Sequence, residues 1–476
     1  MDFNLIMLIL VLVVGFYMAW NIGANDVSNA MGTSVGSGAL TLKKAIFLAA
    51  ILEFCGAFFL GSNVSHTMQH GLIDTSVFDN TPSLFVIGMF SALLATSLWL
   101  QVASYFGWPV SATHAIVGSI LGFGGVIGGA KAVHWPEVGS IAISWIISPL
   151  LSALLSFSLF SFLQRKILFS INPTHQSKKL VPILIGIVFA TFTISLTLGG
   201  LHNLKLAITP IESISIAVVV GCISYLISLI FIRKIKIPDE MNIINKQGYT
   251  QQLISLNKTF KHLKRAELLA EHETKQELTY ILSKIEDLSQ KLSEKSGRHL
   301  IHSEYQTVER MFAILQILSA CYVAFAHGAN DVANAIGPIG AVLDTLQSAS
   351  YSAASSDVPT WLLAFGGAGI VVGLATWGWR VIQTIGKKIT ELTPTRGFSA
   401  EFGAAITILF ASKLGIPVST THCIVGAVLG VGLAKGISAI NLRTLRDIGL
   451  SWLVTIPSAA LLSILLYFIF SSLFRI

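Results

Sequence analysis

The chain has 476 residues, of which 53% are hydrophobic and only 12% are charged, and its mean hydropathy is +0.73. Soluble proteins carry roughly 25% charged residues, so this composition excludes an ordinary soluble protein and indicates a polytopic membrane protein. The net charge of +7 does not indicate nucleic-acid binding, because the basic residues gather in the predicted loops. The four cysteines lack the spacing of a disulfide framework or a zinc site.

Twelve apolar segments approach the roughly 20 residues that a helix needs to cross a bilayer. In chain order they are 5–22, 43–62, 83–106, 109–130, 139–164, 180–200, 213–234, 308–328, 359–379, 398–414, 417–435 and 447–474. The segments 109–130 and 417–435 open with Pro and hydroxyl residues and are rich in Gly, so they are poor candidates for simple spanning helices. No positive stretch precedes the first segment, and we interpret it as a retained membrane helix. The predicted fold class is therefore all-α.

The positions of Lys and Arg predict how these segments are oriented. Basic residues follow the first, fifth, seventh, ninth and eleventh segments, whereas residues 63–82 and 340–358 contain none. Because positively charged loops of membrane proteins face the cytoplasm, we expect both termini outside and residues 235–307 inside. An integral protein of the plasma (inner) membrane is the resulting expectation.

Residues 239–305 are hydrophilic and rich in helix-forming residues. Apolar side chains recur there at helical spacing, at Leu278, Ile281, Ile285, Leu288 and Leu292. This pattern predicts a solvated cytoplasmic helix or a short coiled hairpin. Dimerisation or a regulatory partner remains an alternative, although the pattern covers too few heptads to favour either.

Two short sequence motifs each occur twice, and we call them the acidic phrase and the hydroxyl phrase. Residues 23–30 read Gly-Ala-Asn-Asp-Val-Ser-Asn-Ala and return at 328–335 with one change, and Pro-Val-Ser-Ala-Thr-His at 109–114 returns as Pro-Val-Ser-Thr-Thr-His at 417–422. Duplicated polar phrases at membrane depth are typical of transporters built from internal repeats. We predict a first repeat over 1–165, connecting helices over 166–234, a charged cytoplasmic loop over 235–307 and a second repeat over 308–476. The first repeat begins outside and the second inside, so their topologies are inverted.

Four acidic residues lie in or at the ends of predicted segments: Asp26, Glu53, Asp331 and Glu401. A charge at membrane depth costs roughly 2.5 to 3.5 kcal/mol on insertion scales, and no Lys or Arg lies well inside a predicted segment to pair with these acids. The structural alternative is a helix-end cap with protonated carboxylates. Repetition of one aspartate context favours a functional site.

The first phrase has the composition of a cation site. Asp26 and Asp331 offer anionic oxygens, and neutral amide oxygens come from Asn25, Asn29, Asn330 and Asn334. Gly23 and Gly328 are expected to loosen the helix and free backbone carbonyls. Oxygen-only ligation suits a hard ion such as Na⁺, or a proton on the aspartate, rather than a soft metal.

The second phrase suits an anion. Proline before a helix start, followed by hydroxyls, presents first-turn N–H groups and side-chain donors to a ligand. The hydroxyl residues are Ser111, Thr113, Ser419, Thr420 and Thr421. In inverted repeats the two helix starts would converge near the midplane, whereas ordinary helix capping is the alternative.

Three histidines accompany these phrases: His114, His422 and His327. A histidine titrates near neutrality and could bind substrate or carry a proton. A bond to a backbone carbonyl is the structural alternative. His327 has no counterpart in the first repeat, where Ile22 stands.

Both pairs of phrases resemble those of the inorganic phosphate transporter (PiT) family. Gly-Thr-Ser-Val-Gly-Ser-Gly at 32–38 and Gly-Phe-Ser-Ala-Glu at 397–401 are also similar to motifs of that family, and Glu53 matches the first-half acidic motif. The resemblance covers all but residues 235–305. It implies symport of inorganic phosphate with Na⁺ or H⁺ by alternating access, a homodimer, and twelve spans with two re-entrant hairpins.

The resemblance also implies roles for residues. An ion and phosphate site would be formed with Asp26, Asn29, Asp331 and Asn334, to which we assign Na⁺. Phosphate oxygens would be held by Ser111, Thr113, Ser419, Thr420 and Thr421, and we add Asn25 and Asn330 to this set. Glu53 and Glu401 would be needed for transport and are grouped with the cation-binding residues. Ala112 stands where the second half has Thr420, so phosphate is expected to be held unequally.

The predicted mechanism is electrostatic. Two neighbouring aspartates repel a phosphate dianion, so cations bind first and the anion follows; Na⁺ is favoured over H⁺, and no cofactor is expected. The alternatives are an H⁺-coupled permease for an anion or a metal–phosphate complex, an uncoupled anion channel, and a membrane-embedded phosphate-processing enzyme that uses His114 and His422 as acid and base.

Overall fold

The computed structural model describes residues 3–106, 108, 110–200, 208–235, 262–267, 270–295, 298–347, 358–379, 393–436 and 442–475, with residue 382 and scattered positions between 252 and 260. Pro109 and much of the predicted cytoplasmic loop lie outside the described residues. In these ranges the chain is almost wholly helical, and the β-structure is one isolated bridge between Ile73 and Val133.

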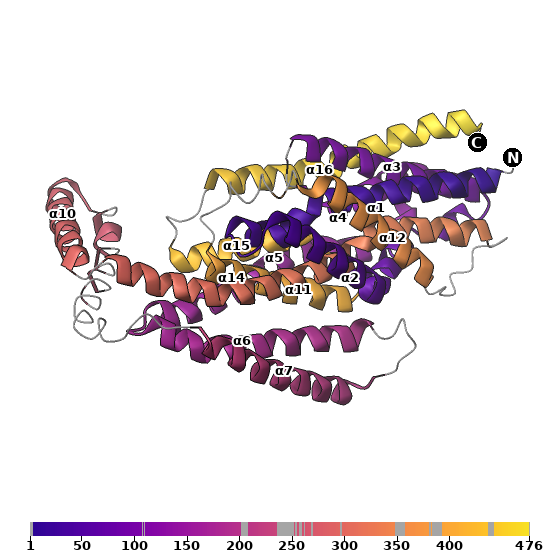
Figure 1. The fold of residues 1–476 in the computed structure, drawn as a ribbon. Helices are drawn as coiled ribbons and strands as arrows, with labels where there is room; N and C mark the ends of the chain where they lie inside the picture. Colours follow the sequence, from indigo (N-terminus) through magenta and orange to yellow (C-terminus); the bar gives the residue numbers. More distant parts are fainter. Residues whose placement is uncertain are drawn as a thin grey trace. The chain divides into compact units, whose positions relative to one another are not determined.

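The principal helices overlap the predicted apolar segments one by one (Figure 1). They are α1 (Phe3–Gly36), α2 (Leu42–His70), α3 (Pro82–Phe106), α4 (Ala112–Phe123), α5 (Trp135–Leu163), α6 (Pro173–Ser195), α7 (Pro210–Arg233), α11 (Arg298–Gln347), α12 (Thr360–Gly373), α14 (Pro394–Lys413), α15 (Thr420–Lys435) and α16 (Leu442–Phe474). A further helix, α10 (His272–Lys295), is the helix predicted from the recurring apolar side chains of the hydrophilic region.

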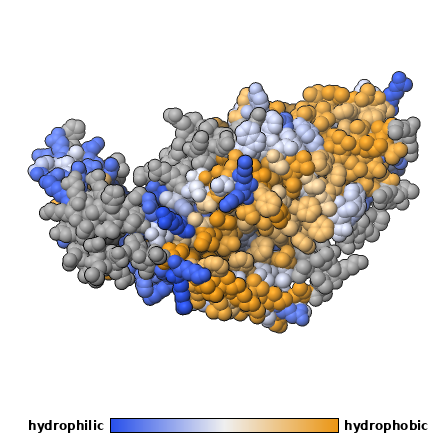
Figure 2. All heavy atoms as spheres, viewed as in Figure 1, coloured by the Kyte–Doolittle hydropathy of each residue, from blue (hydrophilic) through white to orange (hydrophobic). Residues whose placement is uncertain are grey.

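Nine helices in the described ranges are long and apolar enough to cross a membrane, while α4 and α15 are apolar but shorter. Exposed aliphatic side chains along these helices, such as Ile146, Leu150 and Leu154 of α5, suit contact with lipid. Figure 2 shows the same contrast, with hydrophobic atoms over much of the helical surface and hydrophilic ones over α10. The number of spans, the two re-entrant hairpins and the inverted topology stay predictions.

The duplicated acidic phrase lies inside continuous helix in both halves. The helix α1 runs on to Gly36 and α11 to Gln347, well past the phrase in each case. The expectation that Gly23 and Gly328 loosen the helix is therefore wrong. Their function is close packing, because a Cβ at Gly23 would collide with the carbonyl oxygen of Ile370 and one at Gly328 with that of Glu53.

These glycine contacts relate the two halves to each other. In each half a glycine of the phrase helix packs on a backbone carbonyl of a neighbouring helix, and three residues further along that neighbour a glycine packs back. The four contacts are Gly23–Ile370, Gly373–Trp20, Gly328–Glu53 and Gly56–Phe325. Ile370 and Glu53 therefore occupy matching places, although one is apolar and the other acidic.

By compactness the chain divides into two units. One comprises Met1–Phe160, Ile187–Cys222 and Ala313–Ile476, and it contains every candidate site residue; the other comprises Ser161–Gly186 and Ile223–Phe312. Within the second unit, the Tyr305 hydroxyl donates to the Leu168 carbonyl at 2.9 Å. The predicted boundaries of the repeats, the connecting helices and the loop stay predictions.

Candidate functional site

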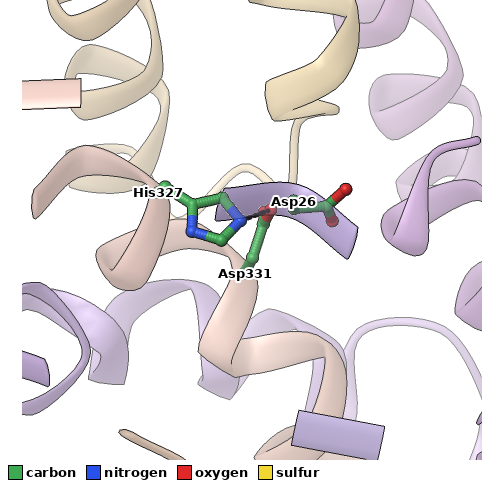
Figure 3. Close-up of side chains that lie close together, drawn as sticks. All are labelled: Asp26, His327 and Asp331. Carbon is green, nitrogen blue, oxygen red and sulfur yellow. Dashed lines mark ion pairs between the residues drawn. The ribbon is translucent and has the colours of Figure 1, made fainter. Parts of the chain in front are cut away.

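The two aspartates of the duplicated phrase lie together in the protein interior. Asp26 in α1 and Asp331 in α11 are each only 1% exposed. One ligand atom from each of Asp26, His327 and Asp331 lies within 4.8 Å of the others (Figure 3). The structure therefore joins residues about three hundred positions apart into one acidic cluster.

His327 lies between carboxylates of the cluster. Its Nε2 atom is 3.0 Å from Oδ2 of Asp331, one turn further along α11, and its Nδ1 atom is 3.3 Å from Oε1 of Glu53 in α2. Neither contact has the alignment of a good hydrogen bond, and each is an ion pair when the imidazole is protonated. Sequence analysis named His327 but did not predict that it pairs with Glu53 and Asp331.

The two hydroxyl phrases form two capped helix starts that meet. Ser111 caps α4 by accepting the N–H of His114 at 3.2 Å, and Ser419 caps α15 in the same way with His422 at 3.2 Å. The Thr113 hydroxyl donates to the carbonyl of Val418 at 3.0 Å, which ties the first turn to the second. Two helix N-termini with their N–H groups and dipoles thus come together, as an anion site requires.

In each half, the helix that carries the acidic phrase (α1 or α11) contacts the hydroxyl turn of the other half. Asn29 donates to the Thr421 hydroxyl at 2.9 Å, and Asn334 donates to the Thr113 hydroxyl at 3.2 Å. The Asn29 amide also lies 3.4 Å from Asp26 Oδ1. The acidic phrases and the hydroxyl phrases therefore form one continuous polar site, and both halves of the chain contribute to it.

Asn25 and Asn330 hold the turns in place. Asn25 donates to the Ser104 hydroxyl at 2.8 Å and Asn330 to the Ser412 hydroxyl at 3.0 Å. Sequence analysis missed the two serines, although a signal was present: residues 103–111 and 411–419 both read Ala-Ser-x-x-Gly-x-Pro-Val-Ser. A direct role of the two amides toward phosphate stays a prediction.

The site is not fully symmetric. Thr420 donates its hydroxyl to Asp331 Oδ2 at 2.7 Å, whereas Ala112 at the matching place has no hydroxyl. The other oxygen of Asp331, Oδ1, has no hydrogen-bond partner within the described chain. A buried carboxylate oxygen in that state is available to a ligand.

Glu401 lies in α14, in a separate cluster of polar side chains of the same unit. Its carboxylate accepts hydrogen bonds from Ser34 at 2.8 Å, from Ser319 at 2.5 Å and from Thr33, and the Gln316 amide approaches to 3.4 Å. None of these contacts was predicted, although Thr33 and Ser34 belong to the motif at 32–38. Glu401 precedes Ser412 by the same interval as Leu93 precedes Ser104, so Glu401 matches Leu93 and not Glu53.

His114 and His422 pack against one another with tilted rings, each three residues beyond the serine that caps its helix. Their ring centres are 4.4 Å apart, and His114 lies 3.9 Å from the ring of Trp145. Both imidazoles are buried. The contact packs the starts of α4 and α15 together, and a role in binding substrate or carrying a proton stays a prediction.

No Lys or Arg pairs with the four buried acids in the part of the chain that the structure describes. His327 is the basic group beside Asp26, Glu53 and Asp331, whereas hydroxyl and amide groups surround Glu401. Such a site offers an unscreened negative potential to a small cation and, through its hydroxyls and helix starts, donors to an anion.

Comparison with known proteins gives a consistent result. A family model described as the phosphate transporter family matches residues 22–463. The chloroplastic inorganic phosphate transporter 2-1 of Arabidopsis thaliana is 44% identical to this chain, over 97% of this chain and 72% of its own length. A solved structure described as the sodium-dependent phosphate transporter has 33% identity and a TM-score of 0.79, covering 98% of this chain and 99% of its own. Each match extends over nearly the whole chain.

Proposed function

The chain belongs to the phosphate transporter family, and from this premise we propose that it moves inorganic phosphate across the membrane together with Na⁺, by alternating access. The observation that carries the proposal is the joining of Asp26 and Asp331 to the two capped turns by the crossed Asn–Thr hydrogen bonds. Cation and anion groups in one buried site make the binding of one ion depend on the other.

The order of binding follows from charge. Without cations the site holds Asp26, Asp331 and Glu53 close to one another, with His327 as their basic partner. A phosphate dianion is repelled by carboxylates at this distance and in a buried environment. Cations held by Asp26, Asn29, Asp331 and Asn334 neutralise the site, after which phosphate binds to the hydroxyls and helix starts.

The phosphate-binding set is unequal between the halves. Ser111 and Thr113 come from the first half, and Ser419, Thr420 and Thr421 from the second. In this structure both serines cap their helices, and Thr113 and Thr421 each contact a backbone carbonyl of the opposite turn. Binding of phosphate would therefore exchange these hydrogen bonds for bonds to the anion. That exchange would couple substrate binding to movement of α4 and α15.

Glu401 belongs to the cation-binding residues in this proposal. The side chains around Glu401 offer carboxylate, hydroxyl and amide oxygens, a set that suits Na⁺ or a proton. They have no contact in common with the aspartate cluster, so a cation bound there would occupy a second site.

Sodium is favoured over the proton because the site ligands are oxygens and because a structural neighbour is described as sodium-dependent. An H⁺-coupled permease for an anion or a metal–phosphate complex is the second candidate, favoured by the imidazole within the aspartate cluster. The enzyme alternative is rejected, since the family consists of transporters.

We further propose a homodimer in the plasma (inner) membrane, with both termini outside and residues 235–307 in the cytoplasm. The basic residues after the first, fifth, seventh, ninth and eleventh apolar segments support the orientation. The chain is an integral membrane protein, and the particular membrane and the dimer are what remains to be tested.

Radiolabelled phosphate uptake into proteoliposomes tests the coupling, with the Na⁺ gradient and the pH gradient imposed separately. We expect uphill uptake with an inward Na⁺ gradient at equal pH and little with a pH gradient alone. The reverse pattern would assign the coupling to H⁺, and uptake that never exceeds equilibrium would indicate a channel.

Asp26→Asn and Asp331→Asn extend the same measurement. Each removes a negative charge with little change of shape, so we expect the Na⁺ concentration for half-maximal uptake to rise at least about tenfold, equivalent to roughly 1.4 kcal/mol of lost cation binding, and Na⁺-driven accumulation to fall. Melting of the purified variants checks that they are folded. Undiminished accumulation with normal Na⁺ dependence in either variant would contradict the proposed site.

A further inference from the structure

We propose that Glu53 acts on the transport site through His327, and that these two positioning residues hold Asp331 with one carboxylate oxygen facing the cation. The inference rests on the proposed function and gives a reason for the presence of a buried glutamate outside the duplicated phrases. Asp331 and Asp26 then differ in the side chains that orient their carboxylates.

The contacts place His327 as a bridge. Its Nδ1 atom is 3.3 Å from Glu53 and its Nε2 atom is 3.0 Å from Asp331, with the side chains of all three residues at most 2% exposed. The two nitrogens of an imidazole lie on opposite sides of the ring. Attraction between Glu53 and one nitrogen therefore favours the ring orientation in which the other nitrogen faces Asp331.

The bridge leaves Asp331 with one open oxygen. Oδ2 accepts the Thr420 hydroxyl at 2.7 Å, and His327 Nε2 lies 3.0 Å from it without the alignment of a hydrogen bond. Oδ1 has no hydrogen-bond partner among the described residues. A carboxylate fixed through one oxygen presents the other in a set direction, which is the function of outer partners around metal ligands.

The first half lacks all of these supporting groups. Ile22 precedes Gly23 as His327 precedes Gly328, and Ile370 takes the place of Glu53. Both isoleucines are fully buried. Ala112 replaces Thr420, so among the described residues Asp26 lacks the imidazole and hydroxyl partners that the second half gives Asp331, and it meets His327 across the cluster. A polar contact on one side thus matches two buried apolar side chains on the other.

A double-mutant cycle tests the bridge. Glu53→Gln, His327→Gln and the double variant are reconstituted, and the Na⁺ concentration for half-maximal uptake and the phosphate KM at saturating Na⁺ are measured. Each single substitution should raise the Na⁺ requirement about tenfold, the lower end of the usual loss for an outer partner. The double variant should raise it no further, with phosphate KM within about twofold of wild type.

Independent action gives a different result. If Glu53 binds a cation directly, the two effects multiply, and the double variant requires about a hundredfold more Na⁺. That outcome would overturn the proposal. So would a Glu53→Gln effect that falls on phosphate KM and leaves the Na⁺ requirement unchanged.

A second set of variants covers the chance that a single substitution leaves a buried charge unpaired and prevents folding. Glu53→Ile with His327→Ile copies the apolar pair of the first half, so this double variant should fold. Na⁺ should still raise its melting temperature in detergent, as a ligand of the folded state does, but at about tenfold higher concentration. Ile370→Val is the matched control and should leave the Na⁺ requirement unchanged.

The Na⁺ dependence of wild-type uptake tests the proposed coupling separately from the bridge. If its uptake does not depend on Na⁺, the proposed coupling fails. The cycle is then read from phosphate KM and from the rise in melting temperature that inorganic phosphate causes. Multiplying effects of Glu53→Gln and His327→Gln on those readouts would overturn the bridge by themselves, whereas non-multiplying effects would support it with a different coupling ion.

Discussion

Thr420 is the residue at which the two hydroxyl turns differ. Its hydroxyl donates to Asp331 at 2.7 Å, and the matching place in the first turn holds Ala112. A hydrogen bond to a charged group contributes about 1.5 to 3 kcal/mol. This single hydroxyl therefore gives the second half of the site a measurable advantage in holding its carboxylate.

Thr420→Ala would make both phrases read Pro-Val-Ser-Ala-Thr-His. We expect it to raise the Na⁺ concentration for half-maximal uptake at least about tenfold, because Asp331 Oδ2 loses its hydroxyl partner. Thr420→Ser keeps the hydroxyl and is the matched control, expected within about twofold of wild type. Equal impairment of the two variants would assign the effect to the methyl group, and wild-type behaviour of both would show that the hydrogen bond does not matter.

At this scale sequence patterns identified the repeated residues well and the unrepeated ones poorly. Repetition marked Asp26 and Asp331, and the structure joins them in one cluster. The contact between His327 and Glu53 could not be predicted, because neither residue has a polar counterpart in the other half and the two belong to different helices. The hydroxyls around Glu401 come from helices far apart in the chain, which local patterns do not reveal.

Helices α1 and α11 show how an element can differ from its prediction. A glycine next to polar residues usually indicates a break, and a break was expected at Gly23 and Gly328. Both helices continue through the glycine. The glycine instead allows the backbone of a neighbouring helix to come into van der Waals contact. Elsewhere hydropathy located the helices, although α2 extends to His70 beyond the predicted end at 62 and α6 begins at Pro173 before the predicted start at 180. The close approach of two backbones depends on tertiary packing that hydropathy does not encode.

Substitution of these glycines tests the packing. Gly23→Ala and Gly328→Ala should each destabilise the protein by about 1 to 3 kcal/mol, because the added Cβ has no space beside a backbone carbonyl. Thermal unfolding in detergent measures the effect. Gly139→Ala is the control, since no atom lies within 4 Å of a Cβ there. If Gly23→Ala melts at the same temperature as Gly139→Ala, the close contact does not exist.

For the whole molecule, the orientation in the membrane can be tested by labelling. The four native cysteines are free, so they can be replaced before single cysteines are introduced. In intact cells an impermeant maleimide should label Asn4→Cys and Ser76→Cys, both at exposed positions, but not Ser283→Cys in α10. Ser283→Cys should react once the membrane is opened. Its labelling in intact cells would reverse the proposed orientation.

The incomplete match between the two halves bears on direction. If the repeats are inverted as predicted, a perfectly duplicated site would look the same from either side of the membrane, and its open forms would bind ions with equal strength. The departures from duplication are the places where that equality can be broken. They are Thr420 against Ala112, His327 against Ile22, Glu53 against Ile370 and Glu401 against Leu93. The sidedness of transport, including any preference for import over export, would then arise in these few unmatched side chains.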